Sequence, residues 1–91
     1  MNKDQIRIKI AEACGWFFMD DSWHYPNGAK ALVLPDYLND LNAMHEAEKV
    51  LTYEQFDEYH VQLAMKMVRP FHAAASQRAE AFLRTLNLWK P

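Results

Sequence analysis

The stretch that decides the fold is LPDYLNDLNAMHEAEKVL, residues 34–51. On a helical wheel its apolar residues gather on one side and its polar residues on the other, which predicts a helix from an N-cap at Asp36 to about Val50. Asp40 falls inside the apolar arc. Since an isolated buried carboxylate is costly, we expect a structural buried acid that binds an arginine or accepts backbone N–H bonds. The candidate arginines are Arg7, Arg78 and Arg84. The alternative is a carboxylate at the floor of a pocket, with a perturbed pKa.

The opposite face of this predicted helix is polar and supplies candidate binding residues. They are Asn39, Asn42 and His45. The string His45-Glu46-Ala47-Glu48 begins like the zinc-protease motif HExxH, but position 49 is lysine. A catalytic zinc site requires three protein ligands, and no third ligand is visible in the sequence, so no metal site is predicted. A solvated helix face is the alternative explanation of these polar residues.

Residues 16–33 form the strand-like part of the chain. Asp20-Asp21 predicts a turn, and Asn27-Gly28 predicts a tight hairpin turn because both residues tolerate positive φ. The return strand should cover Ala31–Leu34, and Pro35 should end it because proline has no N–H to donate. A two-stranded ribbon is marginal alone, so this hairpin must pack on helices.

The hairpin is rich in aromatic residues, which are typical anchors of interfaces. The candidate binding residues here are Trp16, Phe18, Trp23 and Tyr25. One helical layer can cover only one face of a ribbon, so some of these rings should be exposed or buried against another chain. The alternative is that the C-terminal segment with Trp89 folds over the second face.

Three more helices are predicted from capping signals and apolar periodicity. Asn2 to Gln5 fits a capping box that opens a helix ending at Gly15, and Thr52 to Gln55 fits a second box that opens a third helix. Pro70 ends or kinks that helix, and His72–Leu88 is the fourth. The predicted fold is a single α+β domain over residues 1–91: an N-terminal helix, a short antiparallel hairpin, then three helices packed as a layer on it. A strand within residues 61–72 is the alternative for that segment.

Composition excludes several classes of function. The chain has 91 residues with a formal net charge of −2, which gives none of the clustered basic charge of a nucleic-acid-binding protein. Cys14 is the single cysteine, so no internal disulfide and no Cys₂His₂ zinc site can form. Gly15 and Gly28 lie too far apart for a phosphate-binding loop, and we expect no cofactor. The charged N-terminus and the lack of a long apolar run predict a soluble protein of a reducing cytoplasm, with no membrane partner.

Three blocks of sequence are familiar in combination. They are IAEACGW at 10–16, LPDYLNDLNAMHEAEKVL at 34–51 and SQRAEAFLRTLNLW at 76–89. Their order and spacing resemble small tailed-phage and prophage proteins of unassigned role that are grouped as the phage ABA sandwich domain. The resemblance implies a phage origin, expression in the cytoplasm of a host bacterium and a layered α+β fold. It implies no catalytic residues. A central sheet would contain more strands than the one clear hairpin found here.

These observations lead to a functional hypothesis with two alternatives. We expect a non-enzymatic phage accessory protein that binds a host bacterial protein, for example as an inhibitor of CRISPR or another defence system. The first alternative is a homo-oligomer, such as a dimer, that sequesters a small molecule or nucleotide signal by stacking on the hairpin aromatics. Asn39, Asn42 or His45 would then supply polar contacts. A metal-dependent hydrolase ranks last.

Overall fold

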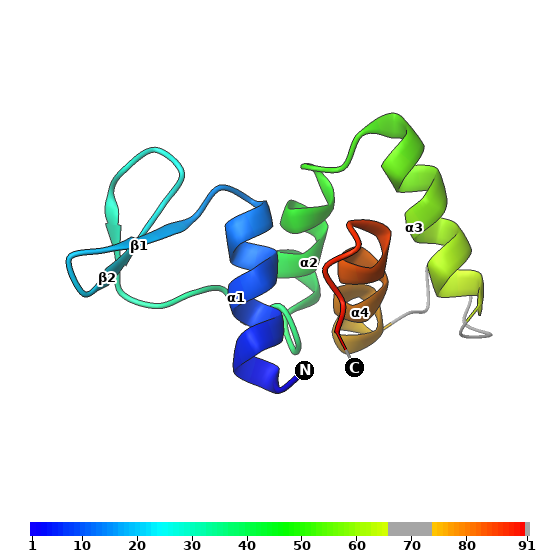
Figure 1. Ribbon diagram of the computed structural model, residues 1–91, viewed down its shortest axis with the longest axis horizontal. Helices are drawn as coiled ribbons and strands as arrows, with labels where there is room; N and C mark the ends of the chain where they lie inside the picture. The colour runs from blue at the N-terminus through cyan, green and yellow to red at the C-terminus, as the bar shows by residue number, and fades with distance from the viewer. Residues whose placement is uncertain (66–73, 91) are drawn as a thin grey trace.

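The computed structural model describes residues 1–65 and 74–90. The helices are α1 (Lys3–Ala13), α2 (Leu41–Glu48), α3 (Tyr53–Met65) and α4 (Ala75–Thr85). The strands are β1 (Phe17–Met19), β2 (Ser22–His24) and β3 (Lys30–Ala31). The predicted α+β class is confirmed, with a helix before the hairpin region and helices after it (Figure 1).

Both ends of α1 follow from local sequence signals. The Asn2 side chain accepts from the backbone N–H of Gln5 at 2.8 Å, and the Gln5 side chain accepts from the N–H of Asn2 at 2.9 Å. This is the predicted capping box. At the other end Gly15 adopts φ +93°, a left-handed conformation that favours glycine. The N–H of Trp16 then reaches the carbonyl of Ala11 at 3.0 Å and ends the helix, as in a Schellman motif.

The sheet is an antiparallel meander in the order β1-β2-β3. Phe18 pairs with Trp23, and Trp23 pairs with Ala31. Asp20 and Asp21 have φ values of 52° and 60°, as a two-residue hairpin turn of type I′ requires. The sheet therefore has three strands, one more than the predicted ribbon. The predicted return strand Ala31–Leu34 is wrong in extent, because β3 ends at Ala31 and the chain leaves the sheet there.

Asp40 requires a correction, because it is exposed and is not a buried acid. It is the N-cap of α2, and its carboxylate accepts from the N–H of Asn42 at 2.9 Å. The predicted cap, Asp36, instead accepts the N–H of Asp40 at its carbonyl and the side-chain amide of Asn39 at its carboxylate, in a separate turn. The helical wheel failed here because it assumed one continuous helix, whereas aspartate prefers the cap to the interior.

The core lies among the four helices, with α4 in the middle. Helices α1, α2 and α3 all pack on α4 (Figure 1). Its buried residues include both small and large side chains: Ala75, Ala79, Ala81, Phe82 and Leu83. The chain ends α4 with a second Schellman motif, in which Asn87 has φ +60° and the N–H of Leu88 reaches the carbonyl of Leu83 at 2.8 Å. The predicted start of this helix at His72, and most of the alternative strand in 61–72, lie outside the described residues; residues 61–65 are helical.

The sheet extends from one end of the helical body, beside α1, and α3 lies at the opposite end (Figure 1). Trp89 does not fold over the hairpin. It packs against the helical core near Ile6 and Leu38, and the Arg84 guanidinium lies 5.4 Å from its ring centre. Of the two alternatives for the hairpin aromatics, the structure therefore favours exposure.

Candidate functional site

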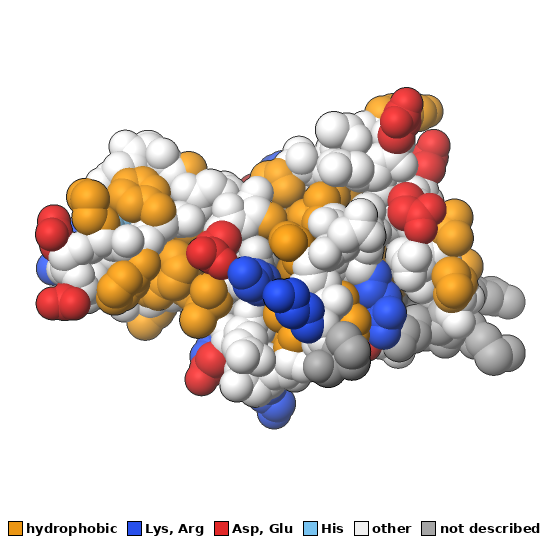
Figure 2. All heavy atoms as spheres, viewed as in Figure 1, with side chains coloured by type: hydrophobic (Ala, Val, Ile, Leu, Met, Phe, Trp, Pro, Cys, Tyr) orange, Lys and Arg blue, Asp and Glu red, His pale blue; other side chains and the backbone are white. Residues whose placement is uncertain are grey.

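Apolar side chains gather on the outer part of the sheet, which we call the sheet surface. It comprises Phe17, Phe18, Met19, Tyr25, Leu32 and Val33, all of them exposed. Phe18 is 58% exposed and Leu32 is 96% exposed. Figure 2 shows hydrophobic side chains spread over this end of the molecule. These side chains lie on both faces of the sheet and on the chain that leaves it, and such a concentration of exposed apolar groups at one end of the molecule makes this end a candidate interaction site.

Cross-strand ring contacts hold the aromatic residues of the sheet in place. On one face Phe17 stacks on His24, with ring centres 5.1 Å apart and an interplanar angle of 4°. On the other face Phe18 lies edge-on to Trp23 at 5.5 Å. Such cross-strand pairs stabilise the register between β1 and β2 and restrict the side-chain conformations of the four rings. The sheet surface is therefore already ordered before any partner binds.

The two edges of the sheet differ in chemistry. Strand β1 is an edge strand, hydrogen-bonded to β2 on one side. Its three residues, FFM, are uncharged and exposed. Strand β3 has only two residues, and one is Lys30. Short length and lysine are ways in which proteins protect an edge from pairing with another chain. Strand β1 is also short, with three residues, but it contains no lysine and no proline, so it is the less protected of the two edges.

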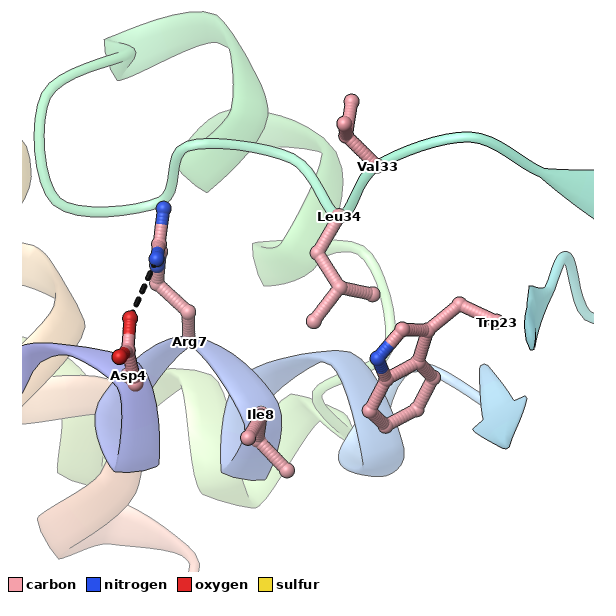
Figure 3. Close-up of a pocket in the computed structure, with 6 residues that line it drawn as sticks. All are labelled: Asp4, Arg7, Ile8, Trp23, Val33 and Leu34. Carbon is pink, nitrogen blue, oxygen red and sulfur yellow. Dashed lines mark hydrogen bonds and ion pairs between the residues drawn. The ribbon is translucent and has the colours of Figure 1, made fainter. Parts of the chain in front are cut away.

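One hollow of about 370 Å³ lies between α1 and the chain that leaves β3. Figure 3 shows Trp23 and Leu34 pointing into it above Ile8. The Arg7 guanidinium, bound to the Asp4 carboxylate, forms the opposite end. Trp23 therefore shares this hollow with apolar side chains and with the Arg7–Asp4 ion pair, and not with the polar residues of α2. We call this the Trp23 hollow.

A second hollow, of about 390 Å³, lies where the end of α1, the hairpin and α2 meet, and we call it the Trp16 hollow. Trp16 and Tyr25 line it with ring centres 4.6 Å apart and planes inclined at 48°. Tyr37 and Cys14 also line it. Burial raises the pKa of Tyr37, and the neighbouring Cys14 adds to this; burial also raises the pKa of Cys14. Both groups therefore stay neutral at neutral pH.

The polar binding residues predicted on the second helix do not join these aromatics. Asn39, Asn42 and His45 are exposed, and none of them lines the Trp23 hollow or the Trp16 hollow. Asn39 instead donates to the Asp36 carboxylate in the turn before α2. The structure thus brings Trp16 and Tyr25 together in one place and Phe18 and Trp23 in another. The combined site of hairpin rings and amide groups expected from the sequence is absent from the described residues.

Sequence reasoning missed a buried polar cluster that joins three helices. The Glu48 carboxylate of α2 accepts from the Tyr59 hydroxyl of α3 at 2.7 Å and from the Arg78 guanidinium of α4 at 2.9 Å. The side chains of Glu48 and Arg78 are only 13% and 9% exposed. Burial raises the pKa of Tyr59, and the adjacent Glu48 carboxylate raises it further. The signal available in the sequence was Arg78, which lies between alanines on the apolar face of the fourth helix.

The described residues show no arrangement that would hold a metal ion. In residues 1–65 and 74–90, no three or more histidine, cysteine, aspartate or glutamate side chains come together. His45 and Glu48 in particular diverge, since Glu48 is bound in the buried cluster and His45 is exposed. Across the same described ranges, each helix is too short or too polar to cross a bilayer.

Comparison with protein-family models, with curated proteins and with solved structures finds no match to this chain.

Proposed function

We propose that the protein acts by binding another protein through the sheet surface. The observation that supports this most strongly is the β1 edge, whose three uncharged side chains are exposed and whose outer backbone groups face no strand. An edge of this kind recruits an extended segment of a partner, which gains main-chain hydrogen bonds from the added strand. Side chains at alternate positions then supply the specificity.

The geometry defines what such a partner would contact. A strand added to β1 would meet Phe18 and Trp23 on one face of the sheet and Phe17 and Met19 on the other. Asp20 and Asp21 lie in the turn at the end of the same edge. An apolar, extended segment with a basic residue near one end would complement both features.

The class of partner that we propose rests on the resemblance of three sequence blocks to phage and prophage proteins. In that setting the partner we propose is a host bacterial protein, for example a component of a CRISPR or other defence system, met in the host cytoplasm. The proposal includes no catalytic step. A second copy of this chain is the competing occupant of the β1 edge, because two β1 strands centred on Phe18 could pair about a two-fold axis.

The Trp23 hollow favours a second candidate function, the binding of a nucleotide signal. It is a hollow in which an aromatic ring and a guanidinium face the same space. A base could stack on Trp23 while a phosphate binds Arg7 in competition with Asp4. Nucleotides that raise the melting temperature of the wild-type protein but not of Arg7→Gln would support this function. If no nucleotide changes the melting temperature of the wild-type protein, this candidate function is contradicted.

The test of the leading proposal is affinity capture with paired variants. The immobilised wild-type protein is exposed to lysates of several bacteria, beside Phe18→Ser and a matched control, Tyr53→Ser, which removes an exposed ring on α3 far from the sheet. We expect proteins retained by the wild type and by Tyr53→Ser to be lost with Phe18→Ser. Equal retention by all three, or no retention by any, would contradict the proposal. Sedimentation that shows a wild-type dimer and a Phe18→Ser monomer would identify the second copy as the occupant.

A further inference from the structure

The Trp16 hollow has a lining unlike that of the sheet surface. Two aromatic rings in contact with each other, Trp16 and Tyr25, line it together with two prolines, Pro26 and Pro35. Its size falls in the range of pockets that hold small ligands. Tyr37, only 3% exposed, forms its deep part. The hollow can therefore surround a compact apolar group on several sides.

The charge of this lining is of one sign. Among the described residues that line the hollow, Glu46, on α2, is the one with a charged side chain, and none is a lysine or an arginine. The faces of tryptophan and tyrosine rings are also electron-rich and attract cations within about 6 Å of the ring centre. A carboxylate beside two such rings repels phosphates and carboxylates. The same arrangement of a carboxylate and two rings complements a cation such as a quaternary ammonium group, whose positive charge is spread over its methyl groups.

We propose that the Trp16 hollow binds a small organic cation of the alkylammonium class. The methyl groups would lie against Trp16 and Tyr25, and the positive charge would face the Glu46 carboxylate. This proposal goes beyond the protein-binding function proposed above. The hollow shares Tyr25 with the sheet surface but includes neither the β1 edge nor the rings of Phe17 and Phe18. Phe18→Ser should therefore leave choline binding in place.

The protein already holds one cation at the rim of this hollow. The Lys49 ammonium lies 2.9 Å from Glu46, in an ion pair whose side chains are about 70% exposed. Exposed pairs of this kind are weak, so a ligand that is also held by aromatic faces can displace the lysine from Glu46. Removal of Lys49 should therefore strengthen ligand binding, whereas removal of the Glu46 charge should weaken it.

The experiment compares choline with its uncharged analogue of the same shape, 3,3-dimethylbutan-1-ol. Each is titrated into ¹⁵N-labelled protein, and the indole N–H signal of Trp16 is followed; Trp16→Phe identifies that signal among the three tryptophans. We expect choline to shift the Trp16 signal and to bind about tenfold or more tightly than the neutral analogue. Equal affinities, or no shift of the Trp16 signal with choline, would overturn the proposal.

Two substitutions at the exposed rim test the role of charge without disturbing the core. Glu46→Gln should weaken choline binding about twofold to fivefold, because the Glu46 carboxylate is exposed, and Lys49→Gln should strengthen it by a similar factor. The matched control is Glu54→Gln, which removes an exposed carboxylate on α3 outside the hollow. Its affinity should equal that of the wild type. If Glu54→Gln weakens binding as much as Glu46→Gln does, choline senses only net charge and the site is refuted.

Discussion

The helical body and the sheet of this protein use aromatic residues in opposite ways. In the body, Phe82 and Tyr59 are fully buried, and the polar groups near them are paired across three helices. In the sheet, Phe18 and Tyr25 are exposed and contact mainly other rings of the same hairpin. The same residue type is thus buried in the core of one region and exposed to solvent in the other.

The difference means that most of the folding free energy should arise in the helical body, whereas the surface that we propose for a partner lies on the sheet. Fully buried side chains contribute most of the stability of a small domain, and exposed ones contribute little. Substitutions in the body should therefore change the free energy of unfolding, and substitutions in the sheet should change binding. Substitutions in each region, measured by unfolding and by binding, test whether stability and binding are separated in this way.

The largest effect is expected for Phe82→Ala in α4. Phe82 is inaccessible to solvent at the centre of the helical packing, and its loss leaves a cavity. We expect unfolding in urea to show a loss of about 3–5 kcal/mol, which would leave little folded protein. A loss below about 1 kcal/mol would show that the core lies elsewhere.

A smaller but still large effect is expected for Arg78→Met. This change leaves the Glu48 carboxylate with the Tyr59 hydroxyl but without its guanidinium partner, in a site that is only 13% exposed for Glu48. We expect a loss of about 3 kcal/mol in the free energy of unfolding. Adding Glu48→Leu should recover most of that loss, because no unpaired charge then remains buried. A double variant that is less stable than Arg78→Met would contradict this explanation.

The helical body should also lose stability in alkali. Tyr37 and Tyr59 have raised pKa values when folded, so above the ordinary tyrosine value of about 10 the unfolded chain loses protons that the folded chain keeps. The two tyrosines should make the free energy of unfolding fall above that pH by up to about 1.4 kcal/mol per pH unit each, and the raised pKa of the Cys14 thiol should add a fall that begins at a lower pH. Tyr59→Phe should make this fall shallower, measured by urea unfolding between pH 9 and 12. Tyr53→Phe, at an exposed ring, is the control and should leave the slope unchanged.

A modest effect is expected at Asp40, and its pattern distinguishes a cap from a buried acid. Asp40→Ala removes the acceptor for the N–H groups at the start of α2 and should cost about 1 kcal/mol. Asp40→Asn should be nearly neutral, since asparagine caps helices about as well as aspartate. Equal and large losses for both variants in thermal unfolding would restore the buried-acid interpretation.

Much of the fold could be predicted because its signals are local. The capping boxes at Asn2 and Thr52 depend on residues three positions apart, and both form as predicted. The left-handed residue Gly15 ends α1 for the same kind of reason. Such features need no knowledge of distant parts of the chain.

The rest depends on which helices meet, which local patterns do not reveal. Asp40 lay on an apolar arc only if the helix extended back to Asp36, and the turn between them moved it to an exposed cap. Glu48 and Arg78 are 30 residues apart, and their pairing follows from the packing of α2 on α4. The sequence places the candidate rings of the hairpin in one segment, but their division between two hollows and one exposed surface depends on the tertiary arrangement.

The separation between body and sheet is tested most directly by the free energy of unfolding of Phe18→Ser, measured in urea. Phe18 is 58% exposed, so its removal takes little apolar surface out of a buried environment. We predict a loss of no more than about 1 kcal/mol relative to the wild type, which is the contribution of the ring contact with Trp23. A loss of 2 kcal/mol or more would contradict this account, because it would mean that the sheet surface is covered in the folded protein in solution.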